Sequence, residues 1–356
     1  MSLRRLRQLL TRSDERPFIA EDRLQRTPDQ LARDHGQTPP CPPLIEALQR
    51  SLDPWAATAS PDSWLKLVIL PPGCDLDPLA DWARQSGHER LRPPTRESLS
   101  EEAANSALDL DGEGVLVIPE LAMWFLRRRG GLERLRLLLK RLAGLQRHCV
   151  VGCDSRAWRF ICRALEAHLI LPEPLSFPPF DEARLRGWLA HTLEKGALSA
   201  TRFRLSRDGR DVFALDKRGR PVSDYFSVLA AHSAGVPWVA WHLWRRSLRA
   251  ATDDDATPYD REQTLWVVAL EAFSLPGQGD TRALLILHAL LIHTALSDAA
   301  LAQVLPEPNL TPLLSALRTA GFIERRHECW QVVPAALPAT RSGLDTAGFP
   351  TDAFAY

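Results

Sequence analysis

Short apolar runs alternate with amphipathic segments through the first half of the chain. Each run has the length and composition of a buried strand, and the segments between them repeat apolar residues at helical spacing. The strand-like runs cover 64–70 (WLKLVIL), 114–118 (GVLVI) and 148–153 (HCVVGC), with a shorter extended segment in 169–177. The helical patterns cover 77–86, 132–146 and 156–166. This alternation predicts an α/β domain whose parallel sheet is covered by helices on both faces.

The pattern changes after residue 180. Residues 181–193 form a helical pattern with Asp181 as its N-cap. Residues 202–215 alternate around Asp208-Gly209, which predicts a two-stranded hairpin. Residues 225–250 are helical and rich in tryptophan, whereas the periodicity of 264–275 fits a strand or a helix equally well.

The C-terminal region has the order of elements of a winged helix. Helical patterns at 282–293, 298–304 and 311–319 precede an alternating hairpin at 322–333, and Ser297 is the expected N-cap of the second helix. The predicted domains are an N-terminal extension (1–60), an α/β core (61–180), a helical region with a hairpin insertion (181–280), a winged helix (281–340) and a C-terminal tail (341–356).

Composition excludes several classes of protein. Lys plus Arg and Asp plus Glu are both 44, so the zero net charge disfavours a strongly basic nucleic-acid binder. Six cysteines without a C-x-x-C pair, and no H-E-x-x-H, predict neither a disulfide scaffold nor a metal site. The longest apolar run, 283–296, has 14 residues, and a membrane span needs roughly 18–20. With no secretory signal pattern at the N-terminus, we expect a cytoplasmic protein without a transmembrane segment.

Several of these segments together resemble a P-loop ATPase. The strand 64–70 followed by Pro71-Pro72-Gly73 and a helix resembles the phosphate-loop position, GVLVIPEL (114–121) is similar to a Walker B strand, and HCVVGCDSRAW (148–158) resembles a sensor-1 strand. Residues 175–189 look like the exit into a helical lid, and 229–244 are similar to the lid helix pair of AAA+ and STAND ATPases. The resemblance implies a P-loop-NTPase-like α/β core, a helical lid and a C-terminal winged helix.

The phosphate-loop position departs from a working motif. G-x-x-x-x-G-K-[ST] cradles phosphates with backbone N–H groups, Lys and a hydroxyl, but residues 71–78 read PPGCDLDP. Asp75 and Asp77 stand where a polyanion would lie, and Pro78 removes an N–H donor from the helix start.

The Walker B position is also altered. Pro119 replaces the magnesium-associated carboxylate, Glu120 remains where the family places its water-activating Glu, and Asp154 ends the sensor-like strand. Gly73, Asp75, Asp77, Glu120 and Asp154 are therefore predicted to be positions of a degenerate nucleotide site, with no catalytic residue and no cofactor.

Two groups of arginines are candidate interaction sites. Residues 201–220 hold seven basic residues against three Asp, and Arg202, Arg204, Arg207 and Arg210 could contact nucleic acid, anionic lipid or an acidic partner. The simpler interpretation is a charged edge that prevents aggregation. Arg127, Arg128 and Arg129 could complete the ATPase site of a neighbouring subunit or only end a solvated helix.

DNA binding through the winged helix is disfavoured, because residues 281–356 contain five Arg and six Asp or Glu. The sequence therefore favours a non-catalytic pseudo-ATPase that acts as a scaffold or regulatory partner, either of an active ATPase or of a second copy of itself. The alternatives are a winged-helix DNA-associated regulator and a nucleotide-binding enzyme with an atypical loop.

Overall fold

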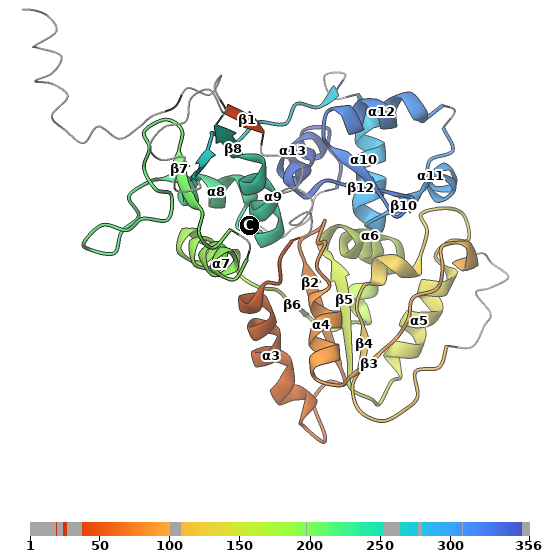
Figure 1. The fold of residues 1–356 in the computed structure, drawn as a ribbon. Coiled ribbons are helices and arrows are strands. Elements are labelled where there is room, and N and C mark those ends of the chain that lie inside the picture. The colour runs from red at the N-terminus through yellow and green to blue at the C-terminus, as the bar shows by residue number, and fades with distance from the viewer. Residues whose placement is uncertain are drawn as a thin grey trace, which may run out of the picture. The chain divides into compact units, whose positions relative to one another are not determined.

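The computed structural model describes residues 19, 24–26, 38–99, 108–196, 198–251, 264–276, 280–307 and 309–350 (Figure 1). The chain forms two compact units: a small unit of residues 1–39 and 180–271, and a large unit of residues 40–179 and 272–356. The α/β region and the C-terminal region therefore belong to the same unit. Among the described residues, no helix is long and apolar enough to cross a membrane.

A five-stranded parallel sheet forms the centre of the large unit, which confirms the predicted α/β class. Its strands are β2 (Leu65–Leu70), β3 (Glu89–Arg90), β4 (Leu116–Ile118), β5 (Cys149–Asp154) and β6 (Pro174–Leu175). Their order is β3-β4-β5-β2-β6, and every neighbouring pair is parallel. Strand β2, which comes first in the chain among these five, thus lies between β5 and β6, which come last.

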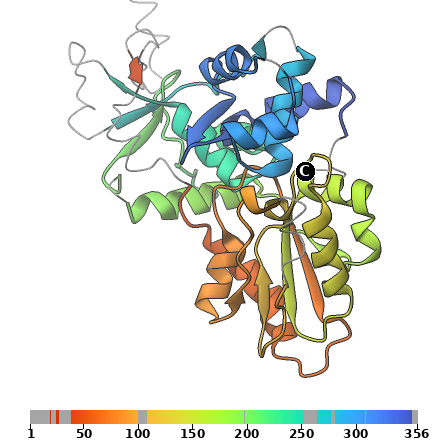
Figure 2. The same cartoon turned by 90° about the vertical axis from the view of Figure 1, so that its right-hand side faces the viewer.

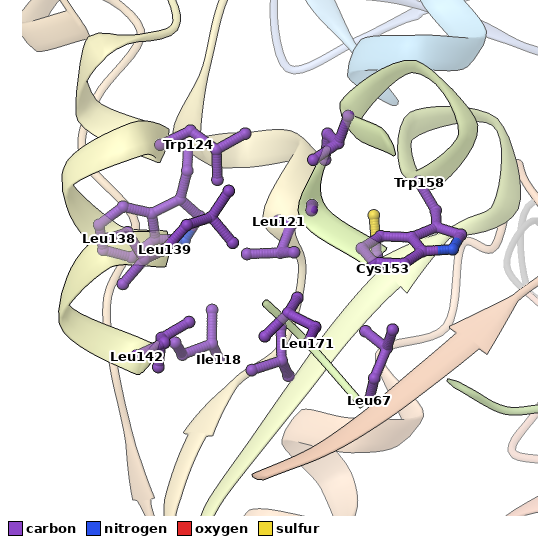
Figure 3. Close-up of a cluster of buried hydrophobic side chains, with 14 of the residues drawn as sticks. Leu67, Ile118, Leu121, Trp124, Leu138, Leu139, Leu142, Cys153, Trp158 and Leu171 are labelled. Carbon is purple, nitrogen blue, oxygen red and sulfur yellow. The ribbon is translucent and has the colours of Figure 1, made fainter. Parts of the chain in front are cut away.

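Alternate side chains of β2, β4 and β5 enter two different hydrophobic clusters. Leu67, Ile118 and Val151 pack in one cluster with α5 (Glu133–Ala143) and α6 (Ser155–Leu165). Val68, Val117 and Val150 pack in the other with α3 (Pro42–Ala56) and α4 (Pro78–Gln85). Figure 2 shows the orange helices on one side of the sheet and the yellow helices on the other, and Figure 3 shows the first cluster in detail. This period-two burial is the reason that the strands read as continuous apolar runs.

The C-terminal region of the large unit has four α-helices and an antiparallel sheet within the residues that are described. The helices are α10 (Thr281–His293), α11 (Asp298–Val304), α12 (Thr311–Thr319) and α13 (Leu337–Thr346). The strands β10 (Leu296–Ser297), β12 (Cys329–Val332) and β11 (Ile323–Arg326) lie in that order. Ser297 caps α11 as predicted, by accepting a hydrogen bond from Ala300 N at 3.2 Å. Helix α13 extends into the expected tail at 341–356 as far as Thr346.

Helix α10 joins this region to the parallel sheet. Ile292 belongs to the same hydrophobic cluster as the sheet residues. Arg96 donates to the carbonyls of Ala122 (3.0 Å) and Phe125 (2.6 Å) in and after the 3₁₀ helix η4 (Leu121–Trp124), and to the carbonyl of His293 (2.8 Å). Segments far apart in the sequence therefore share one core.

The small unit has a four-stranded mixed sheet and three helices among its described residues. The strands, in sheet order, are β1 (Leu24–Arg26), β8 (Leu248–Ala251), β9 (Thr264–Val267) and β7 (Arg202–Leu205). The helices are α7 (Glu182–Glu194), α8 (Tyr225–Ser233) and α9 (Pro237–Arg246). Asp181 caps α7 as predicted, with Arg184 N at 2.8 Å from its carboxylate. Strand β1 comes from the region that the sequence predicts to be an extension.

Two predictions in this unit are wrong. The hairpin at 202–215 has only one strand: β7 pairs with β9 in parallel, and a single bridge joins Arg204 to Asp211. The segment 225–250 contains two helices separated at Ala234 and Gly235, both with positive φ, as its likeness to a helix pair implies, but its last residues form the strand β8 where helix was predicted. The Trp241 ring contacts Trp188 and Trp244, so these tryptophans fill the core of their own unit.

A stability test follows from Arg147, whose buried guanidinium donates to the carbonyls of Leu110, Asp111, Glu113 and Gly114 and to the carboxylate of Glu89. Arg147→Ala leaves these acceptors without their donor, and we expect it to lower the free energy of unfolding by about 3 kcal/mol. Urea denaturation measures the loss. Arg141→Ala, on the exposed face of α5, is the control and should cost less than about 0.5 kcal/mol. Equal stability of the two variants would contradict the assignment.

Candidate functional site

Three loops meet at the carboxyl edge of the parallel sheet. They follow β2, β4 and β5, and they carry Gly73, Asp75, Asp77, Glu120 and Asp154. The connections leaving β2 and β5 enter α4 and α6 on opposite faces of the sheet. In open α/β sheets a ligand binds at such a switch point, outside the carboxyl ends of the strands. The five positions that the sequence predicts for a degenerate nucleotide site therefore lie at one edge of the sheet, and their role as such a site stays a prediction.

The first turn of α4 is capped by the chain itself. Asp77 accepts a hydrogen bond from Ala80 N at 3.0 Å, and Pro78 has no N–H to offer. Burial raises the pKa of Asp77, while this hydrogen bond acts in the opposite direction. A helix N-terminus is a ready binding site for an anion. Here the carboxylate of Asp77 occupies it.

Glu120 is held by its neighbours at the end of β4. Its Oε1 accepts hydrogen bonds from Ala122 N at 2.8 Å and Asp154 N at 3.3 Å, and its carboxyl group is also hydrogen-bonded to Cys153. Burial raises the pKa of Glu120 to about 7, and the nearby Asp77 acts in the same direction. These contacts fix Glu120 between η4 and β5 as a structural link.

Asp154 caps α6, since Ala157 N donates to its carboxylate at 2.8 Å. Pro119, which follows β4, lies against the neighbouring strand β5. A Cβ on Gly152 of β5 would lie 2.0 Å from the carbonyl oxygen of Pro119, so this approach requires glycine. In the part of the chain that is described, no group of three or more His, Cys, Asp or Glu could hold a metal ion.

Residues of the C-terminal region cover the loop after β2. A Cβ on Gly73, where φ is +71°, would lie 2.5 Å from Leu337 Cδ1, and Leu337 is buried. Arg326 of β11 lies 4.0 Å from the carboxylate of Asp75, whose side chain is 9% exposed. Sequence reasoning missed both partners, because nothing in the local pattern at 326 or 337 points to a loop more than 250 residues earlier.

Helix α6 is also tied to the C-terminal residues. Arg156, which is buried, donates to the carbonyl of Pro350 at 3.1 Å and lies 4.0 Å from the carboxylate of Asp345. The regular spacing of Leu337 and Leu344 was the one signal for α13 in the sequence. The contacts of Arg156, Leu337 and Arg326 therefore cover the carboxyl edge of the sheet with side chains of the same chain.

The three consecutive arginines before α5 differ in their surroundings. The Arg127 backbone N–H donates to His293 Nε2 at 3.2 Å, and its guanidinium lies 3.4 Å from His288 Nδ1. Burial lowers the pKa of Arg127. Burial, together with the positive charges of Arg127 and Arg156, lowers the pKa of His288 to about 4. Arg128 donates to the carbonyl of Leu99 at 3.2 Å, whereas Arg129 is exposed. A role in a neighbouring subunit stays a prediction, and Arg129 is the residue that remains accessible for it.

The four arginines proposed from the basic segment are mostly engaged within the small unit. Arg204 donates to the carbonyl of Gly209 at 3.1 Å, Arg207 pairs with Asp224, and Arg210 donates to the carbonyl of Val222 at 3.2 Å. Arg202 is exposed. Their role as a contact surface stays a prediction.

Comparison with known proteins gives structural neighbours only. No protein-family model matches the chain, and no curated protein matches it. The chain is similar to the RuvB Holliday junction branch migration motor of Thermotoga maritima, at 14% identity, with a TM-score of 0.34 and coverage of 94% of this chain and 99% of RuvB. It is similar to the Walker-type ATPase PABY2304 of Pyrococcus abyssi, at 13% identity, with a TM-score of 0.33 and coverage of 83% and 93%. It is also similar to the Aeropyrum pernix ORC1 protein, solved in complex with DNA, at 17% identity, with a TM-score of 0.35 and coverage of 86% and 92%.

The raised pKa of Glu120 predicts a pH-dependent stability. Its carboxyl group is neutral in the folded protein up to about pH 7, whereas the ordinary value near 4.5 applies to the unfolded chain. The unfolded chain therefore releases this proton first, and Glu120 should lower the free energy of unfolding by on the order of 2 kcal/mol as pH rises from 5 to about 8. Glu120→Gln mimics the neutral form. Urea denaturation at pH 5 and pH 8 should show similar stabilities for the two proteins at pH 5 and a more stable variant at pH 8, and parallel losses would contradict the prediction.

Proposed function

We propose that this protein is a non-catalytic, degenerate P-loop-ATPase-like protein that acts as a scaffold or regulatory partner of another protein. The observation that carries the proposal is the Asp77 carboxylate at the N-terminus of α4, where the phosphates of a nucleotide would bind. The proposal includes residues 181–280 as the helical lid and residues 281–340 as the winged helix.

Each part of a phosphate-transfer site is absent or already used. A working loop supplies several N–H donors and a lysine to the phosphates, but here Ala80 N is bonded to Asp77 and residues 71–85, which follow β2, contain no lysine. Like charge on Asp75 and Asp77 would repel a triphosphate. Glu120, the remaining candidate base, is bonded to two backbone N–H groups and to Cys153.

Asp75 strengthens this argument from the other side of the site. Its carboxylate lies 4.0 Å from Arg326, a cation that could otherwise contact a phosphate oxygen. The two aspartates thus take the places of anionic ligand groups, one at the helix N-terminus and one beside an arginine. The site is occupied by the protein's own carboxylates.

A protein partner fits this arrangement better than DNA. The cations of the β11–β12 hairpin are paired: Arg325 with Asp298 (2.9 Å) and Glu328 (2.8 Å), and Arg326 with Glu324 (2.7 Å). Binding to the DNA backbone depends on cations that are free to neutralise phosphates. We therefore favour an active ATPase or a second copy of this chain as the partner, in the cytoplasm.

ATP with magnesium should neither be hydrolysed above background nor raise the melting temperature, because Asp77 occupies the N-terminus of α4 where its phosphates would bind. Steady-state phosphate release and thermal melting measure this. Turnover that disappears in Glu120→Gln, or a melting temperature raised by several degrees with ATP, would contradict the proposal.

Removal of the Leu337 side chain, which packs against Gly73, should destabilise the protein without allowing ATP to bind. Leu337→Ala deletes buried side chain against Gly73, and we expect it to lower the free energy of unfolding by about 2–3 kcal/mol in urea denaturation. ATP should not restore this loss, since Asp77 still caps α4. Leu169→Ala is the control, because Leu169 is 73% exposed. Stabilisation of Leu337→Ala by ATP would show that Leu337 is the only obstacle and that a nucleotide site lies beneath it.

A further inference from the structure

A rigid turn in the small unit displays three cations. Residues 215–221, between β7 and α8, are all exposed, and the green segment that contains them extends from the helices of its unit (Figure 1). Lys217, Arg218 and Arg220 lie on this turn. No ion pair or side-chain hydrogen bond involves these three side chains within the described residues.

Asp216 holds the turn in one conformation. Its carboxylate accepts hydrogen bonds from the backbone N–H groups of Arg218 at 2.7 Å and Arg220 at 2.9 Å. Its own backbone donates to the carbonyl of Arg220 at 2.8 Å and accepts from Gly219 N at 3.0 Å. Gly219 has a φ of +74°, which glycine adopts without strain. The cations therefore project from a preorganised backbone, which lowers the entropy cost of binding.

The base of the turn is anchored in the core of the small unit. Leu215 and Pro221 form a β-bridge, and Val222 N donates to the carbonyl of Ala214 at 3.0 Å. Phe213 contacts the rings of Phe203 and Phe226. The turn is therefore fixed to folded structure at its base.

An exposed apolar side chain lies at the base of the same turn, two residues before Lys217. Leu215 is 42% exposed and is one of three large apolar side chains that are clearly exposed among the described residues. A phosphodiester backbone offers such a leucine little contact, whereas a peptide side chain can cover it. The turn has three cations, and the net charge of the chain is zero. A salt-sensitive nucleic-acid binder makes more contacts to phosphates, roughly six to ten.

We infer that the turn 215–221 is a docking surface for an acidic segment of a partner protein, whose carboxylates pair with Lys217, Arg218 and Arg220 and whose apolar side chain covers Leu215. This inference rests on the proposed role as a protein-interaction partner and identifies the chemistry of the partner. Arginine matches carboxylates with two parallel hydrogen bonds, and the ammonium group of Lys217 adds a third charge.

The test uses the full chain and fluorescence anisotropy with three probes of equal charge. These are a peptide that repeats Glu-Asp-Leu, the same peptide with serine in place of leucine, and single-stranded DNA. We expect the leucine peptide to bind most tightly and to weaken with added salt. The triple variant Lys217→Ala, Arg218→Ala, Arg220→Ala should bind it about tenfold more weakly. Leu215→Ser should weaken it several-fold and remove the preference for leucine over serine.

The matched control removes three exposed cations from the large unit: Lys140→Ala, Arg141→Ala and Arg163→Ala. It has the same net charge as the triple variant and should bind as the wild type does. Absence of peptide binding, or equal loss in both triple variants, would overturn the inference. Tighter binding of DNA that depends on the three cations but not on Leu215 would also overturn it and would assign the turn to nucleic acid.

The same protein samples separate this inference from the proposed function. Phosphate release from ATP is measured on the wild type and the triple variant. Hydrolysis in both would contradict the non-catalytic role and leave the peptide result standing. Absence of peptide binding by the wild type, with no hydrolysis in either protein, would contradict the docking surface and leave the non-catalytic role standing.

Discussion

The carboxylate at the start of α4 is the constraint on which the chemistry of the large unit depends. A parallel sheet with helices on both faces directs the N-terminus of α4, and the partial positive charge of its N–H groups, to the carboxyl edge of β2. An anion is stable at that point, whether it is a ligand or a side chain. Asp77 supplies it from the chain itself, so the site needs no nucleotide to satisfy the helix.

In the proposed role, this replacement of a ligand by side chains also accounts for the packing of the C-terminal region on this edge. A bound triphosphate would fill the space above Gly73 and attract Arg326. With Asp75 beside Arg326 and Leu337 against Gly73, protein atoms occupy those positions. The burial of Ile292 in the sheet cluster and the hydrogen bonds of Arg96 then continue the core from residues 40–179 into residues 272–356. The contacts that cover the carboxyl edge thus belong to the same continuous packing that holds the large unit together.

The elements that depend on local chemistry could be predicted from the sequence. Asp181 and Ser297 are N-caps because their side chains accept a backbone N–H two or three residues ahead, a relation that is visible in the sequence. The five positions of the degenerate site could be placed together because the carboxyl ends of parallel strands meet at one edge. The strand at 202–205 shows the limit. The turn at Asp208-Gly209 forms, with Gly209 N bonded to the carbonyl of Leu205 at 2.8 Å, but β7 finds its partner in β9, and no local pattern specifies a pairing so distant in the chain.

The contacts that cover the site were invisible for a related reason. Helix α13 contains Gly343, which weakens a helical pattern, whereas its Pro338 lies in the first turn, where proline is tolerated. Gly343 is needed for packing, because a Cβ there would lie 2.4 Å from Leu275 Cδ1. Likewise, Arg326 is an ordinary surface cation in the sequence and becomes part of the site only when β11 lies beside the loop after β2. Tertiary contacts override propensity at both places.

A site that is filled by side chains of its own protein does not depend on nucleotide concentration as a ligand-filled site does. A nucleotide stabilises its protein by an amount that follows its concentration, and its release lets the surrounding segments move. Asp75, Asp77 and Leu337 are covalently part of the chain, so their contacts persist at every nucleotide concentration. In the proposed role, this keeps the large unit in one arrangement regardless of the energy state of the cell. In that proposed role, the fraction of the protein bound to a partner would depend on the partner's concentration and on a salt-dependent affinity, and nucleotide would not change it.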